Sequence, residues 1–316
     1  MSAINSPFRY AGGKYYARKL ILAHVPLHTK YIEPFVGGGS IFFAKNKVRN
    51  NQLNDIDAEL INVYVTIRDN PNGLIEFLKR RKDSRIPTEF TKSVAYGNPL
   101  PASKELHTFF KSTYQPLTDL ERAGRWFYLN RTSYSGIMNW QNMYWGYGDK
   151  YSMQPKNWPA NILRTSEKLQ NVQLTNWDFE RVIDEAPNNA FLFIDPPYFN
   201  ADQDKFYQCF FKLEDHIRLE RCLFRNAHRL KIFMTYDNTP EIREMYDWMS
   251  ESYDREWNYC LSRTDDQKNG TEKKGERYKG KELFLLNYDS QEIQVRYQEL
   301  TCTKPILCSH RHRTGV

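Results

Sequence analysis

The turn Asp195-Pro196-Pro197-Tyr198 brings a carboxylate, a rigid backbone carbonyl and an aromatic ring to one point of the chain. It directly follows the apolar run of residues 190–194, which we interpret as a buried strand because it is too short for a helix. A double proline cannot continue a sheet ladder, so the chain must leave the sheet at its carboxyl edge, where open α/β sheets bind ligands. These groups suit a site that holds a flat base by its amino group. The alternative is an ordinary proline turn with an exposed aspartate.

A glycine-rich turn forms a second candidate site. Residues 35–40, which include Phe35, Gly37 and Gly39, follow a predicted strand and precede a predicted helix, so the backbone can approach a ligand beside free helix N–H groups. Neither the dinucleotide pattern G-x-G-x-x-G nor the Walker lysine is present. Asp55 ends the next predicted strand, where an acidic residue can bind ribose hydroxyls or, alternatively, cap the following helix. The two features together indicate an adenosine-containing ligand.

Alternating strands and helices position these residues. The hydrophobic pattern predicts strands at residues 31–36, 53–57, 172–175, 190–194, 230–235 and 281–288, and helices at residues 15–23, 40–45, 58–68, 119–129 and 215–228. Between about residues 70 and 159 the sequence is polar and irregular, with short helical stretches. We therefore expect one α/β domain, residues 1–68 and 166–290, that is split by an insert of residues 69–165. Residues 291–316 form a C-terminal extension whose tail is expected to be flexible.

The composition limits the function. A net charge of +7 and a pI of about 9.0 favour a polyanionic partner. Aromatic residues make up 15% of the chain, many beside Arg or Lys, which suits phosphate contact with base stacking; an aromatic-rich core is the alternative. The sequence shows no bilayer-spanning apolar run, no secretory signal and no disulfide framework, so we expect a cytoplasmic, nucleoid-associated protein. Cys302, Cys308, His310 and His312 fit no established zinc spacing, and no metal site is expected.

Five motifs occur in order along the chain and carry a family resemblance. They are Phe8-Arg9-Tyr10-Ala11-Gly12-Gly13-Lys14, Glu33-Pro34-Phe35-Val36-Gly37-Gly38-Gly39-Ser40, Asn54-Asp55-Ile56, Leu129-Asn130-Arg131 and Asp195-Pro196-Pro197-Tyr198. Over residues 6–288 the chain resembles the Dam-type family of S-adenosylmethionine-dependent DNA adenine-N6 methyltransferases, which belong to the DPPY amino-methyltransferases. The resemblance implies a Rossmann-like methyltransferase sheet with helices on both faces and a mostly helical DNA-recognition insert. It implies S-adenosylmethionine as cofactor and double-stranded DNA as partner; we expect a monomer without an obligate protein partner.

The resemblance also assigns roles to individual residues. Asp195, Pro196, Pro197 and Tyr198 are the implied catalytic residues. The residues implied to bind the cofactor are Tyr10, Lys14, Phe35, Gly37, Gly39, Asp55, Asp178, Phe179 and Asp195. Within this set, Asp178-Phe179 is expected to contact the adenine of the donor. Phe206-Tyr207 and residues 211–216 are similar to the family segment that follows the catalytic turn.

The chemistry of the turn is consistent with this resemblance. An exocyclic amine on adenine or cytosine is a poor nucleophile because its lone pair is delocalised into the ring. Asp195 and the Pro196 carbonyl could accept its two N–H groups, which would aim the lone pair at the donor methyl and stabilise developing positive charge. Tyr198 would stack on a base flipped out of the duplex. Aspartate before Pro-Pro-Tyr favours adenine N6; cytosine N4 and a catalytically idle DNA-binding module are the alternatives.

Six residues are expected to contact DNA: Arg9, Asn130, Arg131, Tyr134, Ser135 and Asn139. The family pattern in the insert is Tyr/Phe-Asn-Gly-Leu-x-Arg. Here Tyr134 and Gly136 are kept, but Ser135 replaces the Asn and Asn139 replaces the Arg. Arg reads guanine bidentately whereas Asn favours adenine edges, and Arg9 stands where a Lys is common, so GATC is not the expected target. Alternatively, the aromatic residues of this region only pack the insert.

Overall fold

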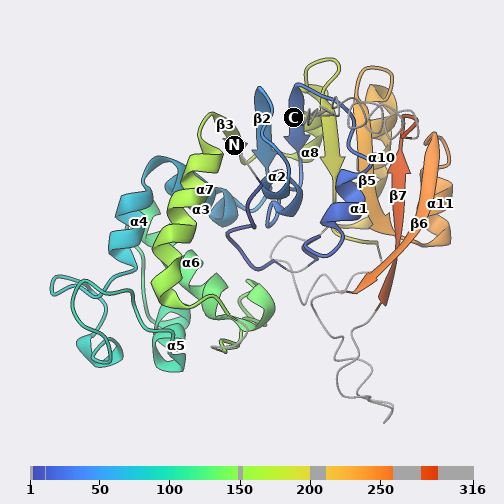
Figure 1. The fold of residues 1–316 in the computed structure, drawn as a ribbon. Coiled ribbons are helices and arrows are strands. Elements are labelled where there is room, and N and C mark those ends of the chain that lie inside the picture. The colour runs from blue at the N-terminus through green and yellow to red at the C-terminus, as the bar shows by residue number, and fades with distance from the viewer. Residues whose placement is uncertain (1–2, 11, 149–151, 200–210, 259–278, 291–316) are drawn as a thin grey trace, which may run out of the picture.

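A seven-stranded sheet forms the centre of the molecule (Figure 1). The computed structural model describes residues 3–10, 12–148, 152–199, 211–258 and 279–290. The strands are β1 Lys30–Glu33, β2 Asn50–Asn54, β3 Val172–Thr175, β4 Phe191–Ile194, β5 Lys231–Asp237, β6 Glu251–Asn258 and β7 Lys279–Leu286. Their order is β3-β2-β1-β4-β5-β7-β6; the first five run parallel, and β7 is antiparallel to both of its neighbours. The strand order reverses between β1 and β4, which is where such sheets bind ligands.

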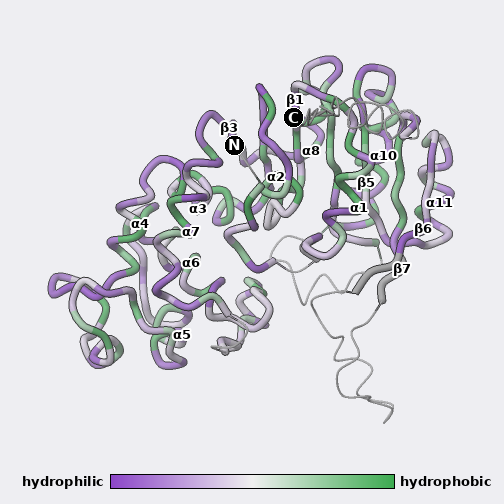
Figure 2. Tube along the Cα trace, viewed as in Figure 1, coloured by the Kyte–Doolittle hydropathy of each residue, from purple (hydrophilic) through white to green (hydrophobic). Residues whose placement is uncertain are grey.

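Helices cover both faces of this sheet. Along β4, Phe191 and Phe193 enter one hydrophobic core, whereas Leu192 and Ile194 enter a second one, as expected for side chains that alternate across a strand. The first core is covered by α1 (Arg18–Leu22), α2 (Ser40–Ala44) and α3 (Ala58–Asp69), and the second by α8 (Phe179–Asp184), α10 (Leu213–Asn226) and α11 (Pro240–Met245). Figure 2 shows hydrophobic residues along the central strands. The predicted α/β, Rossmann-like fold class is confirmed.

The insert is largely helical and extends the first core. It contains α4 (Pro71–Phe77), α5 (Lys104–Ser112) and α6 (Asp119–Thr132), and 3-10 turns at Thr88–Phe90, Tyr134–Gly136 and Pro155–Asn157; α7 (Trp158–Leu169) follows. The helix α6 packs against α3, α4 and α5, and α7 packs against α3 and α4. Phe110, Phe127 and Trp158 are buried in the same core as the sheet residue Phe191, so part of the high aromatic content serves packing. The predicted border between the insert and the second part of the α/β domain, at residues 165 and 166, falls inside α7.

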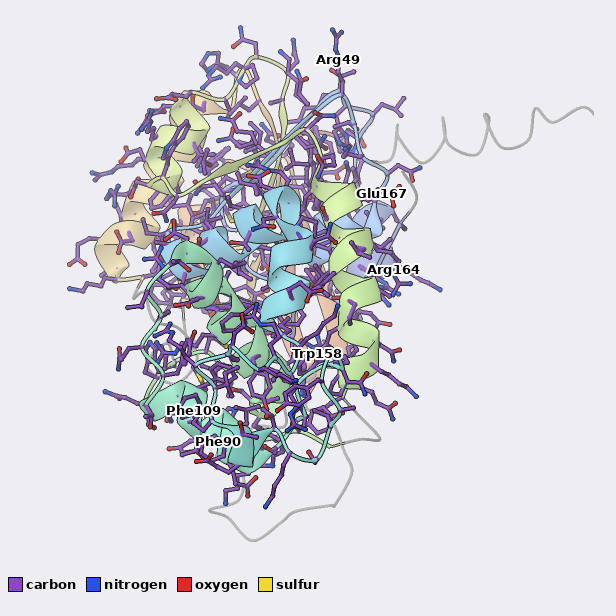
Figure 3. The ribbon with its side chains drawn as sticks, turned by 90° about the vertical axis from the view of Figure 1, so that its left-hand side faces the viewer. Arg49, Phe90, Phe109, Trp158, Arg164 and Glu167 are labelled. Atoms are coloured by element: carbon purple, nitrogen blue, oxygen red, sulfur yellow. The ribbon has the colours of Figure 1, made fainter. Side chains whose placement is uncertain are left out.

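The view from the side of the insert places Trp158 near the start of α7 and Arg164 and Glu167 further along that helix (Figure 3). Phe90 and Phe109 lie at the far end of the insert, with ring centroids 5.3 Å apart. Through this aromatic contact, the connection between α4 and α5 packs against α5. Among the described residues, no helix has the length and apolar character needed to cross a membrane.

Candidate active site

Asp195 lies at the carboxyl edge of the sheet, directly after β4, and two side chains hold one of its oxygens. Nζ of Lys14 is 2.8 Å from Oδ1, and Oγ1 of Thr235 donates to the same oxygen at 2.8 Å. Lys14 comes from the segment that precedes α1, which we call the N-terminal loop. Thr235 comes from β5, the strand next to β4. Oδ2 of Asp195 accepts no hydrogen bond from the residues that the structure describes, and the side chain is 21% exposed. One carboxylate oxygen is therefore fixed, and the other is available to a ligand.

Lys14 is a buried cation at the centre of this site. Its Nζ also donates to the carbonyl of Gly12 at 2.9 Å and lies 4.8 Å from the ring centre of Tyr198. Burial lowers the pKa of Lys14, but the carboxylates of Asp195 and Glu282 outweigh this effect, and the pKa is raised above its ordinary value. Lys14 therefore stays protonated at neutral pH, and its positive charge needs buried negative partners.

Contacts with β5 and β7 help to hold the ring of Tyr198. It is stacked on Tyr236 with centroids 5.8 Å apart, and its hydroxyl donates to the carboxylate of Glu282, a fully buried residue of β7. The carboxylate of Asp237 accepts the amide of Phe199 at 3.0 Å and so fixes the chain after the turn. The turn predicted to be catalytic is thus held from β5 and β7, with its carboxylate and its ring both partly exposed.

Tyr10 packs directly on the glycine-rich turn. A Cβ atom on Gly37 would lie 2.9 Å from Cε1 of Tyr10, and Gly37 itself has a φ of +45°. The amide of Gly37 donates to Oδ2 of Asp55 at 2.9 Å, and its carbonyl accepts the hydroxyl of Tyr64 at 2.9 Å. Burial raises the pKa of Asp55 to about 7, although backbone hydrogen bonds oppose the shift. Tyr10, Gly37 and Asp55, all predicted to bind the cofactor, therefore form one group at the ends of β1 and β2.

A different residue fills the capping role that was the alternative for Asp55. Oδ1 of Asp57 accepts the amides of Glu59 and Leu60 at 2.9 and 3.2 Å, so Asp57 is the N-cap of α3. Oδ1 of Asp55 accepts the amide of Asp57 at 3.1 Å and orders the turn that precedes the helix. Asp55 is half-buried at the end of β2, which is the position of an acidic ribose ligand in such sheets.

Three phenylalanines form an aromatic cluster beside Asp178. The ring centroid of Phe35 is 5.5 Å from that of Phe179 and 5.7 Å from that of Phe211. Asp178 caps α8 and also binds the guanidinium of Arg218 at 3.0 Å, while the same guanidinium lies 4.9 Å from the ring centre of Phe179. The predicted cofactor residues Phe35, Asp178 and Phe179 are therefore neighbours, although they come from distant parts of the sequence.

Asn130 and Arg131 lie in the interior, where they bind the N-terminal loop. Nδ2 of Asn130 donates to the carbonyl of Arg9 at 2.7 Å, and its Oδ1 accepts the amide of Arg9 at 3.2 Å. Nη1 of Arg131 donates to the carbonyl of Pro7 at 3.2 Å, and burial lowers the pKa of Arg131 to about 10. Both side chains are buried, which corrects the expectation that they contact DNA directly. They position the loop that carries Arg9 and Lys14.

A segment after α6 folds back on itself, and we call residues 132–146 the recognition segment. Ser133 and Trp145 form an antiparallel bridge that closes it. Gly136 has a φ of +72°, and a Cβ atom there would lie only 2.3 Å from the carbonyl oxygen of Arg9. A side chain is therefore excluded at Gly136, and the recognition segment is packed directly on the N-terminal loop.

The recognition segment carries the other candidate DNA contacts. Tyr134 is exposed, and Ser135 is half-exposed with a φ of +53°. Oδ1 of Asn139 accepts the amides of Gln141 and Asn142 at 3.0 and 3.3 Å, so this side chain forms a local turn. Tyr134 and Ser135 are accessible to a partner, whereas Oδ1 of Asn139 stabilises the turn within the segment.

Two exposed aromatic residues of the recognition segment were not singled out by the sequence analysis. The guanidinium of Arg125 lies 4.5 Å from the ring centre of Trp140, and Nζ of Lys111 lies 5.4 Å from that of Tyr144. A sequence signal existed, because Trp and Tyr are dense in this part of the chain. The cations come from α5 and α6, and only the fold shows that they meet these rings.

Thr235 and Glu282 are site residues that the sequence analysis missed. Each is a fully buried polar residue within or directly beside an apolar run of its strand, and that run is the signal from which they could have been found. Phe206 and Tyr207 lie outside the described residues, as do Cys302, Cys308, His310 and His312.

Comparisons with known proteins agree with this geometry. The family model for D12 class N6 adenine-specific DNA methyltransferases matches residues 10–260. A type II methyltransferase of Lactococcus lactis subsp. cremoris is 27% identical over 76% of this chain and 84% of its own length. A DNA N-6-adenine-methyltransferase of Escherichia phage P1 is 30% identical over 76% of this chain, which spans only 31% of that longer protein. A type II methyltransferase of Paramecium bursaria Chlorella virus NC1A is 27% identical over 80% of this chain and 91% of its own.

Proposed function

Because this chain belongs to the D12 class of N6 adenine-specific DNA methyltransferases, we propose that it transfers a methyl group from S-adenosylmethionine to the N6 amino group of an adenine flipped out of duplex DNA. Adenine N6, favoured over cytosine N4 by the aspartate before Pro-Pro-Tyr, is the target of this family. The observation that carries the proposal is Asp195, whose Oδ1 is fixed by Lys14 and Thr235 while Oδ2 has no partner among the described residues.

The residues at the sheet edge fit S-adenosylmethionine. The half-buried carboxylate of Asp55 suits a pair of ribose hydroxyls, and the aromatic cluster of Phe35, Phe179 and Phe211 beside Asp178 suits an adenine ring with its amino group. When bound, S-adenosylmethionine supplies an electrophilic methyl group on a positively charged sulfur. We assign donor binding to the following residues: Tyr10, Lys14, Phe35, Gly37, Gly39, Asp55, Asp178, Phe179 and Asp195.

The catalytic turn acts on the amine of the target base. Oδ2 of Asp195 and the carbonyl of Pro196 accept the two N–H groups, and no proline N–H competes for these contacts. The nitrogen lone pair forms the new N–C bond as the methyl group leaves sulfur, and fixed acceptors stabilise the positive charge that develops on nitrogen. N6 then releases a proton to solvent, which restores a neutral amine. Tyr198 provides a flat face for the extruded base.

The insert, residues 69–165, is assigned to DNA recognition. The recognition segment exposes Tyr134, Trp140 and Tyr144, and the rings of the last two each lie beside a basic side chain. Aromatic faces next to cations suit base stacking with phosphate contact. Arg9 is packed against this segment and, together with Tyr134, Ser135 and Asn139, is assigned to reading the target sequence.

Methylation of unmethylated duplex DNA tests the proposal. Purified protein with labelled S-adenosylmethionine should label the DNA, and nuclease digestion with mass spectrometry should find N6-methyladenine.

Asp195→Asn should abolish turnover and keep DNA binding, because that carboxylate serves the chemistry. Asp69→Asn is the matched control, since Asp69 is an exposed carboxylate at the C-terminal end of α3 and has no part in the proposed chemistry. Label found only in RNA or protein would contradict the activity. Failure to bind the donor in calorimetry would favour a catalytically idle DNA-binding module.

A further inference from the structure

Glu282 is a fully buried carboxylate with two neighbours in the active site. It accepts the hydroxyl of Tyr198, and its charge acts on Lys14 together with that of Asp195. A buried carboxylate destabilises a folded protein unless it is paired and hydrogen-bonded. Two of its interactions are with residues to which the proposed reaction assigns base stacking and donor binding, so this buried carboxylate serves the site.

The antiparallel ladder brings Glu282 to this position. In the register of β5 and β7, Glu282 pairs with Asp237 and Phe284 pairs with Thr235. Residues two apart in a strand share a face, and Phe284 belongs to the first core, which the N-terminal loop and α1 also enter. Glu282 therefore lies on the same side of the sheet as Thr235, in the strand next to β5.

The charges explain why a second carboxylate is needed. Lys14 and Asp195 together are neutral, and a sulfonium donor adds another positive charge close to the ammonium group of Lys14. In a site of low dielectric, the ammonium group of Lys14 and the sulfonium repel each other. The single carboxylate of Asp195 would offset only part of that repulsion. Glu282 adds a second carboxylate whose charge acts on Lys14, beside that of Asp195.

We propose that Glu282 is a positioning residue for methyl transfer, whose charge makes the donor site selective for the cationic donor over its neutral product and whose carboxylate orients the ring of Tyr198. This inference rests on the proposed function. It predicts a property that packing alone cannot produce: the affinity for positively charged S-adenosylmethionine depends on Glu282, whereas the affinity for neutral S-adenosylhomocysteine does not.

Calorimetric titration of the full-length protein with both ligands tests the charge. Glu282→Gln keeps an oxygen that can accept the Tyr198 hydroxyl and removes only the charge. It should weaken S-adenosylmethionine binding about tenfold or more and change S-adenosylhomocysteine binding less than about twofold, as expected for loss of one nearby charge. Equal weakening of both ligands, or no effect on either, would overturn the assignment.

Two further variants complete the design. Glu251→Gln is the matched control, because Glu251 also accepts a tyrosine hydroxyl, that of Tyr253, but pairs with Leu286 at the other end of β7. It should leave both affinities unchanged. Glu282→Asp retains the charge and should keep the discrimination between the two ligands even if Glu282→Gln fails to fold; loss of discrimination in a folded Glu282→Asp variant would count against the charge role.

The hydrogen bond is tested separately through Tyr198→Phe, which keeps the ring and removes the hydroxyl. We expect kcat to fall about fivefold to tenfold with little change in the donor KM, since loss of a hydrogen bond to a charged group misplaces the ring and leaves the donor contacts intact. An unchanged kcat would overturn the orienting role of Glu282. Wild-type protein that neither binds the donor nor methylates DNA would instead refute the proposed function, so the two failures are distinguishable.

Discussion

The side-chain amide of Asn130 is hydrogen-bonded to both main-chain polar groups of Arg9, at 2.7 Å to the carbonyl and 3.2 Å to the amide. Asn130, like its neighbour Arg131, joins α6 of the insert to the N-terminal loop, and that same loop delivers Lys14 to Asp195. The insert and the proposed donor site are thus connected through this loop.

We expect Asn130→Ala to loosen this connection. The variant removes two hydrogen bonds to the partly buried main chain of Arg9, which should lower the free energy of unfolding by about 1–3 kcal/mol. Donor affinity should fall as well, because the loop also carries Lys14. Thermal unfolding and donor calorimetry measure the two effects. Asn72→Ala, a change at an exposed position of α4, is the control; equal donor affinity in Asn130→Ala and wild type would show that the loop is held by other contacts.

Apolar runs and periodicity explain which elements the sequence could predict. The strand before Asp195 was located closely because this buried parallel strand is apolar throughout. The helix after Asp57 was located to within a residue from its periodicity, although its cap is Asp57 and not Asp55. The helices α4, α5 and α7 were not located in a segment that reads as polar, and the charged edge strand β6 was not predicted, since its stability comes from pairing with β7.

The site shows a similar division. Asp195, Lys14 and Asp55 were identified from motifs, and the fold brings each of them to the carboxyl edge of the sheet. Thr235 and Glu282 depend on strand order and antiparallel register, which local sequence does not encode. Asn130 and Arg131 were expected to contact DNA because the family resemblance places this region on DNA, but the end of α6 packs against a loop more than a hundred residues away in sequence. Only long-range packing decides between these two locations.

Thr235 should contribute to catalysis through its bond to Asp195. Thr235→Val keeps the shape of the side chain and removes the hydroxyl that donates to Oδ1 at 2.8 Å. A hydrogen bond to a charged group contributes about 1.5–3 kcal/mol, so we expect kcat to fall by about tenfold or more. Thr235→Ser should restore most of the activity, because it restores the donor. A fully active Thr235→Val variant with unchanged stability would mean that Lys14 alone orients the carboxylate.

The side chain of Asn139 has a turn-forming oxygen and an amide donor, and the two roles can be tested separately. Asn139→Asp keeps the acceptor for Gln141 and Asn142 but removes the donor, so the local turn should be kept. If the amide reads a base edge, discrimination at one base pair should fall by about 1–3 kcal/mol. Methylation of a randomised DNA library followed by sequencing measures this. Identical site preference in Asn139→Asp and wild type would assign Asn139 to the turn alone, and Tyr134 and Ser135 would remain as the accessible candidates.

Donor binding should depend on pH through Asp55. Burial raises the pKa of this carboxyl from its ordinary 3.8 to about 7, so at pH 6 most of the folded, unliganded protein carries it protonated. Only the ionised form offers its full acceptor capacity to two ribose hydroxyls, and donor affinity should therefore rise as the pH increases from about 6 to 8.

The stability of the unliganded protein should change in the opposite direction. Between the ordinary pKa and about 7, the folded state binds a proton at Asp55 that the unfolded state has released, so this group lowers the free energy of unfolding as the pH rises through that window. Asp55→Asn should remove both trends while keeping an acceptor for the amide of Gly37. The measurements are donor calorimetry and thermal unfolding of both proteins between pH 5.5 and 8.5, compared as differences so that other titrating groups cancel. A donor affinity that is constant over this range in the wild type would show that Asp55 does not bind the donor through its ionised form.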